Sequence, residues 1–139
     1  MHTTEEYIAE LEREVQMREK VYPGRVTQGK LTQAAADRKV ELIESLIRVF
    51  RAAADLDCHP QDLSLPISMP PAQLTSLEPH LREVEQEIKW REHILLRSNY
   101  GRATRQIKLD QLQILREILE HLRAIQNRHQ ARQTQTTLF

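Results

Sequence analysis

The stretch TQAAADRKVELIESLIRVFRAAAD, residues 32–55, decides the fold because it carries the strongest helical signal in the chain. Its apolar residues recur at alternating steps of four and three, which places them along one face of an α-helix. They are Ala36, Val40, Ile43, Ile47, Phe50 and Ala54. Thr32 would cap the helix by accepting a hydrogen bond from a free backbone N–H. The stretch therefore predicts an amphipathic helix whose apolar face must be covered by other elements.

A second amphipathic helix is predicted before this stretch, at about residues 4–22. Its apolar stripe is formed by Ile8, Leu11, Val15 and Tyr22. These residues follow heptad spacing, and Arg18 occupies the one position that breaks the stripe. Pro23 and Gly24 are expected to end this helix, before a turn through Gly29 and Lys30.

Residues 56–75 contain four prolines and are expected to form a linker or an extended arm, because proline breaks a helix interior. Apolar residues alternate along this segment, which indicates that it lies against the helices. They are Leu63, Leu65, Ile67 and Met69.

Two further helices are predicted after this segment. Ser76 would cap the third helix, with Pro79 tolerated in its first turn and a break near 99–101 at its end. Its stripe consists of Leu77, Leu81, Val84, Ile88 and Leu95, again with Arg91 in the gap. The stripe of the fourth helix consists of Leu112, Leu115, Ile118, Leu119, Leu122 and Ile125. This helix is expected to fade into a polar tail after about residue 129.

The two pairs of helices resemble each other in sequence. Residues 12–21 align with 85–94, and residues 40–52 overlay 112–124 after one gap. The competing explanation is that any two amphipathic helices look alike. If the halves are copies, each is a helical hairpin with an apolar face that the other must cover. We therefore predict an all-α fold in which two similar hairpins form a four-helix bundle. The expected units are an N-terminal hairpin (1–55), a Pro-rich linker (56–75), a C-terminal hairpin (76–130) and a flexible tail (131–139).

Two arginines, Arg18 and Arg91, lie on apolar stripes and require an explanation, because an unpaired buried charge is very costly. Each stands one to two turns before a hairpin turn, and an aspartate stands at a similar distance after it. We predict ion pairs between Arg18 and Asp37 and between Arg91 and Asp110. The alternative is that both guanidinium groups reach solvent at the edge of the stripe.

Length and composition limit the class of protein. The chain of 139 residues predicts one domain, or two small ones sharing a core, and its single cysteine excludes an internal disulfide. No apolar run approaches the roughly 20 residues that span a bilayer, and the N-terminus lacks a signal-peptide pattern. We therefore expect a cytoplasmic protein that does not enter a membrane. It would be a monomer or a homodimer, since the regular stripe over 36–54 suits either state.

Charge is zoned although its formal sum is zero. Residues 20–39 hold five bases and one acid, and residues 88–109 hold six bases and one acid. Both zones surround hairpin turns, and hairpins stacked in parallel would join them into a surface able to bind phosphates or an acidic partner. The candidate contacts are Arg25, Lys30, Arg97, Arg102, Arg105 and Lys108. The competing explanation is that bases near helix C-termini complement the helix dipole.

No pattern in the sequence indicates catalytic residues, and no cofactor or metal is expected. A Gly-rich phosphate loop is absent, and the histidines are scattered. The pairs Glu41-x-x-Glu44 and Glu117-x-x-Glu120 are expected to face solvent rather than to converge on a cation. Trp90, beside an apolar stripe, is interpreted as a packing anchor rather than a ligand platform.

The chain ends in Gln135-Thr136-Thr137-Leu138-Phe139. This ending resembles the pentapeptide by which bacterial replication and repair proteins dock on the sliding clamp. The resemblance implies contacts through Gln135, Leu138 and Phe139, the last two filling an apolar pocket. The competing explanation is a Gln-rich tail that ends in Leu-Phe by chance.

Residues 17–31, MREKVYPGRVTQGKL, resemble small helical proteins encoded by bacteriophages and prophages. In these, Met-Arg-x-x-Val-Tyr-Pro leads to Gly-Lys-Leu and then to an Ala-x-x-Arg helix. This chain departs from the pattern at Gly24 and Arg25, where a larger residue is usual. The resemblance implies a mobile-element origin and a helical hairpin, but no particular activity.

The leading hypothesis is therefore a non-enzymatic, phage-derived interaction protein that binds the host sliding clamp through its tail. The alternatives are a host-takeover or anti-defence inhibitor, or a nucleic-acid-binding protein, acting through the bundle surface and the basic hairpin tips.

Overall fold

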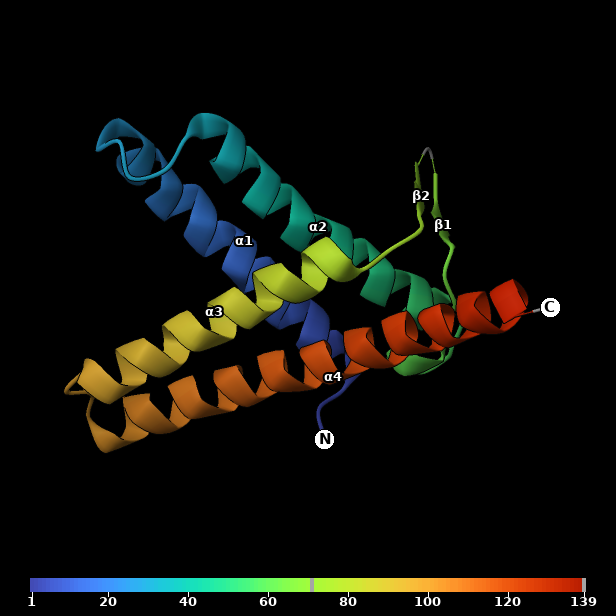
Figure 1. Ribbon diagram of the computed structural model, residues 1–139. Coiled ribbons are helices and arrows are strands. Elements are labelled where there is room, and N and C mark those ends of the chain that lie inside the picture. Colours follow the sequence, from blue (N-terminus) through green and yellow to red (C-terminus); the bar gives the residue numbers. More distant parts are fainter. Residues whose placement is uncertain (71, 139) are drawn as a thin grey trace.

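Four helices form two antiparallel hairpins in the computed structural model, which describes residues 1–70 and 72–138, the last three by their backbone alone. The first hairpin consists of α1 (Thr4–Thr27) and α2 (Gln33–Asp55), and the second of α3 (Glu78–Arg97) and α4 (Arg102–Leu138). The hairpins cross, and their turns diverge toward the left of Figure 1. The predicted all-α fold of two helical hairpins is confirmed.

Helix α1 begins with a capping box between Thr3 and Glu6, in which each side chain accepts a hydrogen bond from the other residue's backbone N–H. The expected end at Pro23 is wrong, because α1 continues to Thr27. Proline removes one intrahelical hydrogen bond, but Pro23 is exposed and water can reach the carbonyl that loses its donor. Gly29 then makes the turn with a φ of +74°.

Helix α2 begins as predicted, with the Thr32 hydroxyl accepting from the Ala35 N–H at 3.1 Å. Ala36, Ile43, Ile47 and Phe50 of the predicted stripe are buried, whereas Val40 is only partly buried and Ala54 is exposed. The buried face also includes Leu46, Val49 and Ala53, which the predicted stripe did not contain. The fully buried Phe50 packs against Tyr7 of α1, with 5.6 Å between ring centroids. Tyr7 is a core residue that the sequence stripe did not include.

The Pro-rich segment contains a 3-10 turn, η1 (Pro60–Asp62), and two short strands, β1 (Ile67–Met69) and β2 (Ala72–Leu74). The strands pair antiparallel, with Ile67 opposite Leu74, and project from the helices in Figure 1. The expectation that alternating apolar residues lie against the bundle is confirmed, because Leu63, Leu65 and Ile67 belong to the core. The strands themselves were not predicted.

Helix α3 follows Leu77, one residue later than the predicted cap, and Ser76 accepts from the Glu78 N–H at 3.3 Å. The predicted break separates α3 from α4. The helical backbone of α4 extends to Leu138, so the expected loss of helix after about residue 129 is wrong. Residues 131–135 are exposed and polar or small, so they show no apolar stripe that would predict a helix. Such residues can still form the backbone hydrogen bonds of a helix.

One apolar core is shared by both hairpins and by the segment between them. Its most deeply buried large side chains come from α1, α2 and α4 and from the residue just before α3, and they include Tyr7, Leu11, Leu46, Phe50, Leu77, Leu112, Ile118 and Leu122. Gln126 of α4 accepts from the Leu77 N–H at 2.7 Å and so connects the start of α3 to this core. The two halves are therefore parts of a single packed unit.

Candidate binding cleft

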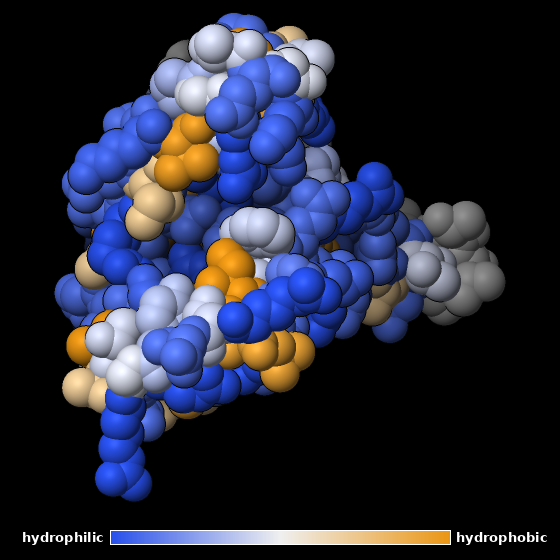
Figure 2. All heavy atoms as spheres, turned by 90° about the vertical axis from the view of Figure 1, so that its left-hand side faces the viewer, coloured by the Kyte–Doolittle hydropathy of each residue, from blue (hydrophilic) through white to orange (hydrophobic). Residues whose placement is uncertain are grey.

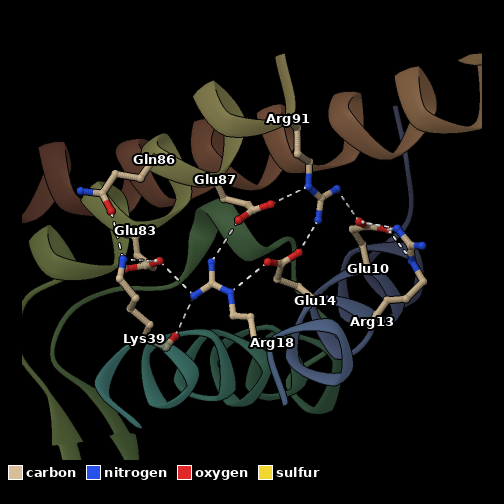
Figure 3. A network of polar contacts seen from close by, with 9 residues as sticks. All are labelled: Glu10, Arg13, Glu14, Arg18, Lys39, Glu83, Gln86, Glu87 and Arg91. Carbon is tan, nitrogen blue, oxygen red and sulfur yellow. Dashed lines mark hydrogen bonds and ion pairs between the residues drawn. The ribbon is translucent and has the colours of Figure 1, made fainter. Parts of the chain in front are cut away.

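Six charged side chains meet where α1 crosses α3, and Figure 3 shows them pointing toward one another. We call this set the arginine cluster, and its members are Glu10, Glu14, Arg18, Glu83, Glu87 and Arg91. Arg18 is only 2% exposed, and three of the glutamates are also buried. Since buried charge is costly unless it is paired, the contacts of each arginine matter to the stability of the crossing.

Arg18 joins α1 to both neighbouring helices. Its Nε donates to Glu14, one turn earlier on α1, at 2.9 Å. Its Nη1 donates to Glu83 of α3 at 2.9 Å and to the backbone oxygen of Lys39 at 3.0 Å. Its Nη2 donates to Glu87 at 3.3 Å. The guanidinium is thus held by three carboxylates and one carbonyl.

Arg91 occupies the equivalent position on α3. Its Nε donates to Glu87, one turn earlier on α3, at 3.0 Å. The two terminal nitrogens cross to α1, where they donate to Glu10 at 2.7 Å and to Glu14 at 2.6 Å. Two arginines, each donating to three different carboxylates, therefore connect the hairpins from opposite sides.

The partners predicted for the two arginines are wrong. Among the described residues, no ion pair within 4.0 Å joins either arginine to Asp37 or Asp110. Asp37 is exposed and accepts from Gln33 at 2.8 Å, while Asp110 contacts His2 at 3.0 Å. Because the hairpins cross, the two arginines pair with carboxylates of the other hairpin and not with the aspartate on the antiparallel helix of their own hairpin.

Corresponding residues of the two halves make corresponding contacts. Each arginine pairs with the glutamate one turn earlier on its own helix and with two glutamates of the opposite helix. Outside the cluster, Arg51 pairs with Glu12 at 2.7 Å, and Arg123 pairs with Glu85 at 3.2 Å. These contacts match the alignment of residues 12–21 with 85–94, and they make the crossing approximately two-fold symmetric.

The carboxylates of the cluster do not ionise alike. Burial would raise the pKa of Glu14, but Arg91 and Arg18 outweigh this effect and lower it. Burial and the nearby Glu14 carboxylate raise the pKa of Glu87 despite the attraction of Arg91. The glutamates hold Arg18 and Arg91 firmly in their charged forms, since both arginine pKa values are raised against the effect of burial.

A cleft of about 390 Å³ opens beside the arginine cluster, between α1 and α3. Figure 2 shows the side of the molecule on which the hairpin turns lie, with apolar surface on both hairpins next to a hollow. Met17 and Val21 contribute from α1, and Trp90 and Ile94 contribute from α3. Met17, Trp90 and Val21 are 52%, 49% and 37% exposed. Trp90 is therefore not the packing anchor that was expected, and it lines an open surface instead.

Basic groups surround this apolar surface. The Arg25 guanidinium lies 5.9 Å from the ring centroids of both Tyr22 on α1 and Trp90 on α3, so its cation–π contacts connect the two walls of the cleft. Lys108 of α4 also lines the cleft. Among the described residues, neither Arg25 nor Lys108 has an ion-pair partner within 4.0 Å. Both charges are available to a ligand.

The six predicted basic contacts are not brought together on one surface. Arg25 and Lys108 line the cleft, whereas Lys30 lies in the turn between α1 and α2, and Arg97 and Arg102 flank the turn between α3 and α4. The side chain of Arg105 donates to the Leu95 backbone oxygen at 3.1 Å. The two hairpin turns stand apart in Figure 1, so the basic residues around them are not joined into one surface.

A second polar group lies at the N-terminus, where Glu117 is buried instead of facing solvent as expected. Glu117 accepts from the His2 backbone N–H at 2.9 Å and from the Tyr7 hydroxyl at 2.9 Å, and it contacts the His2 ring. Burial opposes ionisation, but these hydrogen bonds lower the pKa of Glu117 to about 2. Sequence spacing did not reveal this contact because His2 and Glu117 are far apart in the chain. The Glu117 carboxylate finds its hydrogen-bond donors within the protein, which favours a structural role for this residue.

Of the predicted clamp-binding residues, Gln135 is exposed near the end of α4. The side chain of Leu138 and the whole of Phe139 lie outside the described residues.

Within the part of the chain that the structure describes, no three His, Cys, Asp or Glu side chains are placed to hold a metal ion. No helix in that part has the length and apolarity needed to cross a membrane. No known protein family matches the chain, and neither a curated protein nor a solved structure is significantly similar to it. The cleft, in which Met17, Val21 and Trp90 are exposed beside Arg25 and Lys108, is the candidate binding site.

Proposed function

We propose that this protein is a non-enzymatic interaction protein whose cleft binds an anionic macromolecule. The observation that carries the proposal is the exposure of Met17, Val21 and Trp90 beside unpaired Arg25 and Lys108. Exposed apolar surface rimmed by charge is typical of a binding site. The arginine cluster supports the site because it holds the two walls in a defined relation.

The test is a titration with oligo(dT) and with poly-L-glutamate, followed by the fluorescence of Trp90, the only tryptophan in the chain. We expect saturable binding of at least one polymer at low salt, with a Kd in the micromolar range that rises with salt. A double variant, Arg25→Glu with Lys108→Glu, should weaken binding by about tenfold or more.

The matched control is Lys20→Glu with Arg38→Glu, which makes the same change of charge at exposed residues that do not line the cleft. It should bind within about threefold of the unmodified protein. Equal losses in both variants would mean that general charge, and not the cleft, attracts the polymer. Failure of both polymers to bind at low salt would overturn the proposal.

A second candidate function is recruitment to the bacterial sliding clamp, as expected for a phage-derived protein that uses host replication. It is favoured by the C-terminal part of α4, which projects beyond the other elements in Figure 1 and in which residues 131–135 are exposed. A short segment in this position can be presented to a partner without disturbing the core.

A clamp titration tests this second function directly. The intact protein should bind with a micromolar Kd, and both Gln135→Ala and the double variant Leu138→Ala/Phe139→Ala should weaken binding by about tenfold. The cleft variant Arg25→Glu/Lys108→Glu serves as the control and should bind the clamp normally. Tight binding by the Leu138/Phe139 variant would exclude the tail as the clamp contact.

A further inference from the structure

We propose that the natural occupant of the cleft is an acidic amphipathic helix of a partner protein. This inference rests on the proposed function and names the chemistry of the ligand.

The apolar residues of the cleft form two facing rows. Met17 and Val21 are four residues apart on α1, and Trp90 and Ile94 are four residues apart on α3. This spacing places each pair on one helix face, one turn apart. A groove between two helices with such rows accepts the apolar stripe of a third helix, whose own anchors recur every three to four residues.

The charge of the cleft selects an acidic ligand. Arg25 and Lys108 have no ion-pair partner within 4.0 Å among the described residues, whereas Glu14 and Glu87 in the cleft wall are already paired with arginines. Acidic side chains flanking the apolar stripe of a partner helix would reach the two free cations. Complementary charge of this kind speeds association and fixes orientation.

The aromatic rings favour a peptide over a single-stranded nucleic acid. Binding of single strands depends on free aromatic faces on which bases stack. The Trp90 ring already stacks on the ring of His93, with 5.9 Å between the ring centroids, and the Arg25 guanidinium lies over it. The centroid of the Tyr22 ring lies 5.7 Å from the guanidinium of Arg18 and 5.9 Å from that of Arg25.

The test begins with selection on the full-length protein from a displayed library of helical peptides of about 18 residues, long enough for five turns. Both apolar and charged positions are randomised without a bias in charge. Counter-selection uses the double variant Met17→Gln/Val21→Gln, which makes two exposed cleft residues polar without adding charge. Circular dichroism confirms that the variant keeps its helices.

We expect the enriched peptides to carry a net negative charge and apolar residues at helical spacing, and to shift Trp90 fluorescence on titration. Met17→Gln/Val21→Gln and Arg25→Glu/Lys108→Glu should each lower affinity at least about tenfold. The control Leu96→Gln/Ile107→Gln changes apolar residues that are 84% and 57% exposed but do not line the cleft. It should leave affinity within about threefold.

The outcomes separate this inference from the proposed function. Enrichment of neutral or basic peptides would overturn the acidic helix while keeping a peptide-binding cleft. Cleft-dependent binding of oligo(dT) without any enriched peptide would overturn the helix and keep an anion-binding function. If neither peptides nor polymers bind in a way that the cleft variants abolish, both proposals fail.

Discussion

At the scale of single residues, the arginine cluster is the most consequential feature. Arg18 and Arg91 interrupt apolar stripes, yet they make buried ion pairs between the hairpins. Buried ion pairs of this type add little net stability over apolar packing, but they are costly to break. They also specify how the two hairpins cross, because each guanidinium fits only one arrangement of carboxylates.

Replacing Arg91 by alanine should destabilise the fold by about 3–5 kcal/mol, because Glu10, Glu14 and Glu87 would lose a shared cation. Urea unfolding measures the change. Arg51→Ala is the matched control, since its pair with Glu12 is exposed and should be worth about 1 kcal/mol or less. Equal effects of the two substitutions would contradict the role given to the cluster.

His80 should make stability depend on pH. Its Nε2 lies 3.1 Å from the Ser45 hydroxyl, and burial lowers its pKa from 6.5 to about 4, with Arg38 and Arg48 acting in the same direction and Glu41 opposing them. The unfolded chain therefore takes up a proton first, so stability falls as the pH drops from about 6.5 toward about 4.

Between about pH 7 and pH 5, this loss should amount to about 2 kcal/mol. Urea unfolding of the unmodified protein and of His80→Gln at both pH values isolates the contribution, since other titrating groups are common to both proteins. A loss of the same size in His80→Gln would show that His80 does not cause it.

At the scale of elements, solvent exposure of the backbone had more influence on where α1 and α4 end than proline, glycine or polar composition did. Proline and glycine indicated an end of α1 at Pro23, and polar composition indicated an end of α4 near residue 129. Both helices continue, because exposed backbone groups can be hydrated and neither position is required to turn. The capping residue Thr32 was predicted correctly, because its hydrogen bond is local.

Pro23→Ala should therefore raise stability by about 1 kcal/mol or more, since it restores an intrahelical hydrogen bond in an exposed stretch of α1. The midpoint of urea unfolding is the measurement. Gly24→Ala, at a position with no neighbouring atom within 4 Å of the added methyl group, gives a reference for helix propensity alone. A decrease in stability for Pro23→Ala would indicate that proline is needed for the turn that follows.

At the scale of the whole molecule, one core and one polar cluster join the two halves. Separate fragments 1–75 and 76–139 should each lose most of their helical structure, because neither hairpin can cover its apolar face alone. Mixing them should restore helicity in a one-to-one complex. Circular dichroism of each fragment and of the mixture tests this, and a fully folded fragment on its own would contradict it.

The sequence by itself determined the helices, their stripes, the central break and the similarity of the halves, because these depend on local spacing and composition. It also singled out Arg18 and Arg91 as residues in need of partners. Only the tertiary structure decided which carboxylates they meet, because the crossing of the hairpins brings Glu83 and Glu87 to Arg18 from far along the chain. The same crossing separates the basic tips and leaves Met17 and Trp90 exposed in a cleft. Periodicity identifies a helix face, whereas the packing of whole hairpins determines whether that face is buried or open.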